Sequence, residues 1–111
     1  MSKQIEKFIP KALEAINKFD IADNGAVPKQ FNGYIASFGA SVRQAGLLAT
    51  VLFYNGSKGS EEDRSKVIQA IEYIIGEPII KQNNTVDKKI RAKVDDAAVA
   101  LKLSVRTFKL V

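Results

Sequence analysis

Basic residues are concentrated in the last third of the chain. Residues 79–111 contain eight Lys and Arg against three Asp, whereas residues 1–78 contain nine basic and nine acidic residues. The whole net charge of +5 therefore lies in the C-terminal third. Such an asymmetry favours a polyanionic partner, and nucleic acid is the simplest one.

Five of these basic residues share one face if residues 85–111 form a helix. On a helical wheel they fall within an arc of about 60°, which also contains Asp95. The five are Lys88, Arg91, Lys102, Arg106 and Lys109. A stripe of this kind contacts backbone phosphates without regard to base sequence, and each contact releases counterions. We therefore predict a phosphate-binding face on the last helix.

Three other basic residues, Lys89, Lys93 and Arg43, are weaker candidates for the same role. Few aromatic residues accompany the stripe, which argues against base stacking as the main mode of binding. An ordinary solvated face with i, i+4 ion pairs would produce the same pattern of charges.

Apolar residues also occur on the side of this helix that lies opposite its core stripe. They are Val99, Leu103 and Leu110. A surface helix is usually polar there, so these residues indicate a contact with another subunit. A further helix of the same bundle, packed on that side, would explain them equally well.

The chain contains no histidine and no cysteine. Their absence excludes Cys–His and Ser–His–Asp catalysis and most transition-metal sites. The acidic run Glu61–Asp63 is typical of the first turn of a helix. The glycines around Lys58 lack the spacing of a phosphate-binding loop. We therefore expect a binding protein with no catalytic residue, no metal and no cofactor.

Apolar residues recur at helical spacing over most of the chain. The first helix is predicted from Ser2 to Phe19, and the second from Pro28 to Tyr54 with a bend allowed by Gly39 and Gly46. The predicted core positions of the second helix are Phe31, Ile35, Phe38, Val42, Ala45, Ala49 and Phe53. From Ala45 onward the second helix is apolar on all sides, so we expect it to lie in the centre of the fold.

Two more helices complete the predicted fold. Ser60 is the expected N-cap of the third helix, which ends at Gly76, and Thr85 is the expected N-cap of the last one. The core stripe of the last helix is Ile90, Val94, Ala97, Ala98, Leu101, Val105 and Phe108. The fold class is all-α: a bundle of about four to six helices with a central apolar helix, forming one domain over residues 1–111.

The sequence shows no signal for export or for membrane insertion. The N-terminus Met1–Lys7 mixes charges and lacks the apolar stretch of a signal peptide. The most apolar run, Ala45–Tyr54, has half the roughly twenty residues that a membrane span needs. We expect a cytoplasmic protein.

The second helix combines several features that are similar to a known family. An aromatic-containing turn at Tyr34–Phe38 is followed by the pair Gly46-Leu47, by Thr50 and by an apolar-aromatic end at Phe53. Together with the opening Ile5–Ala15, these features resemble the small helical subunit of the Cmr-type (type III-B) CRISPR RNA-targeting effector complex. The segments 77–85 and 108–111 follow the family pattern less closely.

The resemblance implies an all-helical subunit without an activity of its own. Such subunits stack beside copies of themselves along the guide–target duplex and help to hold the target RNA, while other subunits cleave it. The implied partners are guide RNA, target RNA and the other subunits, with no small-molecule substrate. Three alternatives remain open: the small subunit of a Csm-type complex, a free-standing helical nucleic-acid-binding protein, and a helix-bundle adaptor whose basic face is only solvated.

Overall fold

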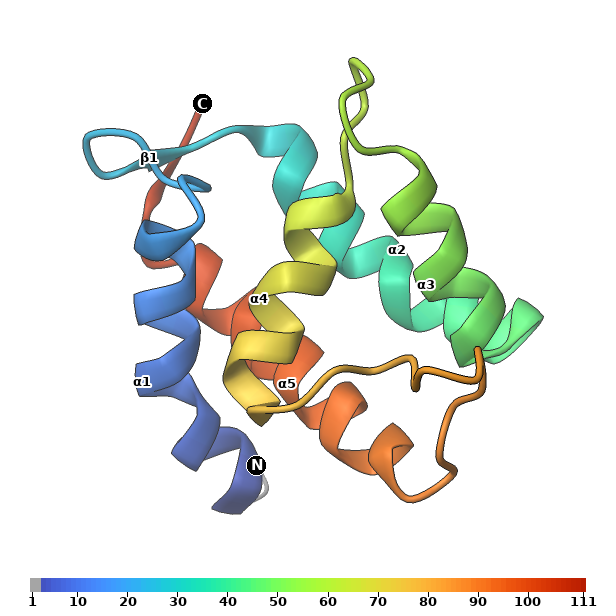
Figure 1. Cartoon of the computed structure of the whole chain (residues 1–111). Coiled ribbons are helices and arrows are strands. Elements are labelled where there is room, and N and C mark those ends of the chain that lie inside the picture. Colours follow the sequence, from blue (N-terminus) through green and yellow to red (C-terminus); the bar gives the residue numbers. More distant parts are fainter. Residues whose placement is uncertain (1–2) are drawn as a thin grey trace.

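Five helices and two strands of two residues make up the computed structural model, which describes residues 3–111 (Figure 1). The elements are α1 (Lys3–Lys18), β1 (Ala26–Val27), α2 (Lys29–Ala45), α3 (Leu47–Gly56), α4 (Ser65–Ile75), α5 (Ile90–Val105) and β2 (Lys109–Leu110). The predicted all-α class is confirmed, and the buried side chains form one continuous core. The predicted helix start at Ser2 lies outside the described residues. No helix within residues 3–111 is both long and apolar enough to cross a bilayer.

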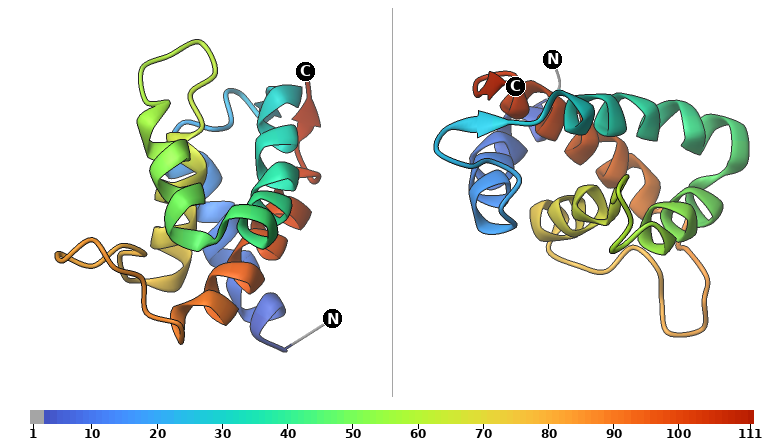
Figure 2. Two further views of the ribbon diagram at one scale, coloured as in Figure 1. Left: turned by 90° about the vertical axis from the view of Figure 1, so that its right-hand side faces the viewer. Right: turned by 90° about the horizontal axis from the view of Figure 1, so that it is seen from above.

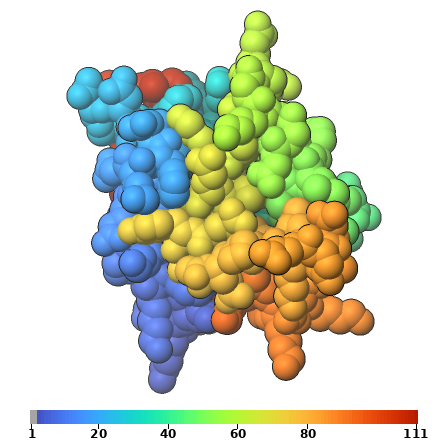
Figure 3. All heavy atoms as spheres, in the orientation of Figure 1, coloured from blue at the N-terminus to red at the C-terminus, as the bar shows by residue number. Residues whose placement is uncertain are grey.

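The central helix of the bundle is α5. Helices α1, α2 and α4 all pack against it, whereas α3 mainly contacts α2 and α4. Figure 1 shows α5 crossing behind α4, and Figure 3 shows α4 on the near face between α1 and α3. The predicted core stripe of α5 is buried from Ile90 to Val105, and Phe108 is partly buried. The prediction that the segment from Ala45 onward is central is wrong, because α3 exposes Leu52 and Phe53.

The predicted long second helix is broken at Gly46. This residue has φ +93°, a conformation that L side chains rarely adopt, so α2 ends there and α3 begins in a new direction. The predicted core positions of α2 from Phe31 to Val42 are buried. Beyond the break the same pattern fails: Ala49 and Phe53 are exposed. The buried residues of α3 are instead Leu47, Thr50, Val51 and Tyr54.

Helix α4 begins five residues later than the predicted N-cap at Ser60. The carboxylate of Asp63 accepts hydrogen bonds from the backbone N–H of Ser65 (2.9 Å), the Ser65 hydroxyl (2.6 Å) and the backbone N–H of Gly59 (2.9 Å). These bonds hold the loop before α4 and satisfy a free donor at the helix start. The predicted end of the helix is confirmed, because Gly76 has the left-handed φ of +77°.

The last helix is shorter than predicted at both ends. Asp87 accepts a hydrogen bond of 2.9 Å from the backbone N–H of Lys89, and α5 starts at the next residue rather than near Thr85. The preceding loop, residues 76–89, projects from the bundle in both views of Figure 2. After Val105 the chain leaves the helix, and β2 pairs in parallel with β1, with Ala26 opposite Lys109.

Candidate nucleic-acid interface

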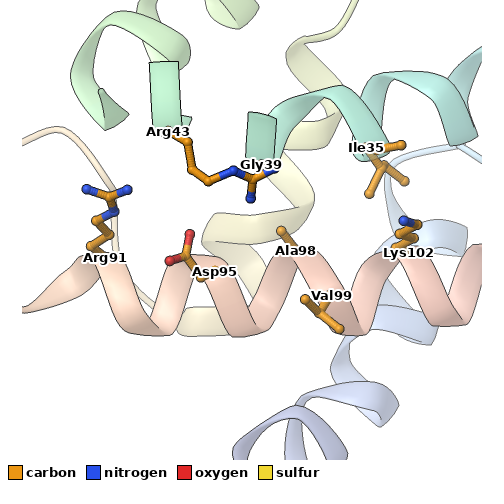
Figure 4. A pocket seen from close by; sticks show the side chains of 9 residues that line it. Ile35, Gly39, Arg43, Arg91, Asp95, Ala98, Val99 and Lys102 are labelled. Atoms are coloured by element: carbon orange, nitrogen blue, oxygen red, sulfur yellow. The ribbon is translucent and has the colours of Figure 1, made fainter. Parts of the chain in front are cut away.

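A groove of about 430 Å³ lies between α2 and α5 (Figure 4). Its wall on α2 consists of Ile35, Ala36, Gly39 and Arg43, and its wall on α5 consists of Arg91, Asp95, Ala98, Val99 and Lys102. Small residues line both walls of the groove: Ala36 and Gly39 on α2 and Ala98 on α5. Charged side chains stand around this narrow apolar floor.

The α5 wall follows from the helical period. Arg91, Asp95 and Lys102 are spaced by four and then seven residues, which places them on one side of a helix with 3.6 residues per turn. This part of the predicted stripe is therefore present, with the acidic residue inside it. Figure 4 shows Arg91 and Asp95 pointing from α5 toward α2.

Arg43 supplies a basic group from the opposite wall. Its side chain extends along α2 toward Gly39 (Figure 4). A methyl group at Gly39 would lie 3.7 Å from a guanidinium nitrogen of Arg43. This is an ordinary van der Waals distance, so the guanidinium of Arg43 lies directly beside Gly39 at the edge of the groove. Sequence reasoning ranked Arg43 as a weak candidate, since it lies 48 positions before Arg91 in the chain.

The charged groups of the groove have no ionic partners among residues 3–111. The ion pairs there are Lys11–Glu14, Glu62–Arg64, Lys81–Asp87 and Glu77–Lys93. None of them involves Arg43, Arg91, Asp95 or Lys102. The side chains of Arg43, Arg91 and Lys102 therefore keep their hydrogen-bond donors available for an external anion.

The other predicted basic residues lie around the groove rather than in it. Lys88 and Lys89 are exposed just before α5, and Arg106 is exposed just after it. The prediction that all five basic residues of the stripe lie on one helix is wrong, because Lys109 belongs to β2 and Lys88 and Arg106 flank α5. Only Arg91 and Lys102 lie within α5. Lys93 pairs with Glu77 at 3.3 Å, which partly offsets its charge.

The chain matches the family model of CRISPR-associated protein (Cas_Cmr5) over residues 4–107. The chain belongs to this family. The Cmr-type resemblance is thereby confirmed, and membership implies an effector complex with other subunits. The matched residues include both walls of the groove. Comparisons with curated proteins and with solved structures give no match.

Of the predicted subunit contacts of this Cmr-type subunit, Val99 and Leu103 lie one turn apart on α5, whereas Leu110 lies in β2. Val99 is 42% exposed and lines the groove. Leu103 is partly buried, and Leu110 lies in β2, where it packs against the core. Within residues 3–111, the most exposed large apolar residues are Phe53 (61%), Val111 (59%) and Leu52 (54%). Sequence reasoning missed Leu52 and Phe53 because it extended the second helix through Gly46; the glycine itself was the available signal.

A second cleft, of about 220 Å³, lies near the start of α2. It is lined by Asp20, Ile21, Pro28, Gln30, Phe31, Tyr34, Glu61, Asp63 and Lys66. Hydrogen bonds from Gly59 and Ser65 lower the pKa of Asp63, which already serves the local fold. No three Asp or Glu side chains in the described part of the chain are grouped as a metal site would require. The acidic cleft therefore offers less to a polyanion than the α2–α5 groove.

Proposed function

We propose that this chain is a non-catalytic, RNA-binding subunit of a type III-B CRISPR ribonucleoprotein. In this proposal it stacks along the guide–target duplex and holds target RNA by its backbone. The observation that carries the proposal is the convergence of Arg43, Arg91 and Lys102 on one groove, none of them in an ion pair within residues 3–111. Family membership supplies the ribonucleoprotein context.

The spacing of the cations suits a strand better than a single phosphate. Arg91 and Lys102 are eleven residues apart on α5, which corresponds to about 16 Å along the helix axis. Arg43 adds a second guanidinium from α2. A guanidinium can bind phosphate through two parallel hydrogen bonds, and Lys acts as a point charge. A backbone lying in the groove would thus meet positive charge on both sides.

Lys88, Lys89 and Arg106 would extend the same contact beyond the groove. Lys88 and Lys89 lie beside the N-terminal end of α5, and Arg106 lies beside its C-terminal end. They are exposed and belong to none of the ion pairs of residues 3–111. The proposed path of the RNA therefore follows the axis of α5.

Stacking beside copies of the chain is supported by apolar surface. The side chains of Leu52 and Phe53 on α3 are more than half exposed. Large exposed apolar groups of this kind are typical of protein contacts. In the proposed arrangement, α3 contributes to the contacts between subunits while α2 and α5 face the RNA.

The salt dependence of RNA binding tests the proposal. The triple variant Arg43→Gln, Arg91→Gln, Lys102→Gln removes the charges of the groove and keeps polar side chains. Each phosphate contact with a single strand contributes roughly 0.7 to the slope of log K against log salt. We expect the variant to flatten this slope by about two and to bind RNA more weakly at every salt concentration.

A matched control removes three charges elsewhere. Lys7, Lys29 and Lys58 are exposed, lie outside the groove and form none of the ion pairs above. Their triple Gln variant has the same net charge as the groove variant, and we expect it to keep most of the wild-type slope. If both variants behave alike, the basic face acts only through net charge. The chain would then be an adaptor with a solvated face.

A further inference from the structure

Asp95 places a negative charge in the middle of the basic groove. It follows Arg91 by one helical turn and precedes Lys102 by two turns on the same side of α5. Its side chain is exposed and points toward α2 (Figure 4). A groove that bound only phosphates would be weakened by this carboxylate, because like charges repel. Its position therefore calls for a ligand that also carries a hydrogen-bond donor.

The protein itself does not use this carboxylate. Asp95 forms no ion pair and accepts no side-chain or backbone hydrogen bond within residues 3–111. Arg91 lies four residues before it, which is the less favourable order for an i, i+4 pair. By contrast, Asp63 and Asp87 each accept a backbone N–H at a helix start. The acceptors of Asp95 remain available to a molecule in the groove.

We propose that Asp95 is a specificity-determining residue that accepts a hydrogen bond from a ribose 2′-hydroxyl of the bound strand. This inference rests on the proposed function, in which Arg91 and Lys102 contact the phosphates of that strand. A carboxylate offers only acceptors. Along a nucleic-acid backbone the 2′-hydroxyl is the group that can donate, and DNA lacks it. Asp95 thus favours RNA over DNA without reading bases.

Three short single-stranded probes of one mixed sequence test this role: RNA, 2′-O-methyl RNA and DNA. The 2′-O-methyl probe keeps the ribose oxygen and loses its proton. Fluorescence anisotropy should show wild-type protein binding RNA roughly tenfold more tightly than the 2′-O-methyl probe, as one charge-assisted hydrogen bond predicts. In Asp95→Ala this ratio should fall to about one. In Asp95→Asn, which keeps a carbonyl acceptor, the ratio should lie between the wild-type value and that of Asp95→Ala.

Asp96→Ala is the matched control. It removes the same charge from the next residue of α5, which does not line the groove. We expect this variant to keep the wild-type ratio. An unchanged ratio in Asp95→Ala would overturn the inference. So would equal tightening of all three probes by that substitution, since the carboxylate would then only repel phosphate.

The two proposals fail in different ways. If the groove triple variant weakens RNA binding while the ratio is independent of Asp95, only the role of Asp95 is rejected. If no probe binds at low salt, or if removal of the three groove cations has no more effect than the Lys7, Lys29, Lys58 control, the groove is not the RNA site and both proposals are rejected.

Discussion

The hydroxyl of Tyr54 on α3 donates a hydrogen bond of 2.7 Å to the backbone carbonyl of Tyr34 on α2. The Tyr54 ring also packs edge-to-face on Phe38, with ring centroids 5.5 Å apart. A second link lies near the break, where the hydroxyls of Ser41 and Thr50 are 2.9 Å apart. These contacts join α3 to the segment of α2 that also carries the groove wall, since Tyr34, Phe38 and Ser41 alternate along the chain with the wall residues.

Tyr54→Phe should lower the free energy of unfolding by about 1 kcal/mol, because it removes one hydrogen bond and keeps the ring. Burial raises the pKa of Tyr54. A raised pKa contributes stability that is complete below the ordinary tyrosine range and is lost as pH rises through the folded value. In urea unfolding, the free energies of unfolding of wild type and variant should therefore differ most near neutral pH and less above about pH 10. A difference that grows with pH would contradict this assignment.

Asp63→Ala should cost about 1 kcal/mol of stability at neutral pH, as the loss of a helix-start acceptor usually does. The backbone N–H of Gly59 is the largest cause of the lowered pKa of Asp63, followed by the Ser65 hydroxyl. The stabilisation is present above the ordinary aspartate range and is lost as pH falls through the lowered folded pKa. The free energies of unfolding of wild type and variant, measured by chemical unfolding, should therefore become equal at acidic pH. Glu61→Ala, which removes an exposed carboxylate of the same loop, should have little effect at either pH.

Alanine substitutions at two glycines of this region should change the stability of the protein in opposite directions. Gly46→Ala should destabilise the protein by about 1–3 kcal/mol, because Gly46 has φ +93° and ψ 162°, which suit glycine alone. Gly33 lies within α2 with no atom within 4 Å of an added Cβ. Gly33→Ala should therefore stabilise the helix by up to about 1 kcal/mol. Thermal unfolding measures both, and equal shifts of the two midpoints would refute the assigned break at Gly46.

Filling the groove should impair RNA binding without unfolding the chain. Ala36 is exposed and lines the groove, so leucine there narrows it while keeping good helix propensity. Ala36→Leu should weaken RNA binding severalfold in an anisotropy titration. Ser37→Leu provides the control, because Ser37 is exposed on the same helix and does not line the groove. Similar affinities for the two variants would place the RNA elsewhere.

Local periodicity predicted the core positions of α2 and α5 and the side chains that form the α5 side of the groove, but it did not predict the buried residues of α3. Arg91, Asp95 and Lys102 lie within α5, where the spacing alone determines which side chains share a face. The prediction failed for Lys109 because the end of α5 depends on a distant partner. Pairing of Lys109 with Ala26 in the β1–β2 ladder takes the chain out of the helix. No sequence pattern near residue 109 predicts that it pairs with Ala26, 83 positions earlier in the chain.

The α2 wall could not be predicted for a related reason. A groove requires two helices at a known distance, and that distance depends on how Ala36, Gly39 and Ala98 face one another. A wheel drawn on one helix contains no information about the helix opposite. Gly46 carried a local signal, but the apolar run after it suggested continuity, and the exposure of Phe53 followed from the break.

The β1–β2 pair also joins the two walls of the groove at one end. β1 leads directly into α2, β2 follows the end of α5, and the backbone N–H of Lys29 binds the carbonyl of Val111 at 2.9 Å. The Ile35 and Lys102 end of the groove is therefore anchored, whereas the Arg43 and Arg91 end has no such tether. If the groove widened to admit a nucleic-acid strand, the β1–β2 pair would hold the Ile35 and Lys102 end together, and the distance between Arg43 and Arg91 would increase most.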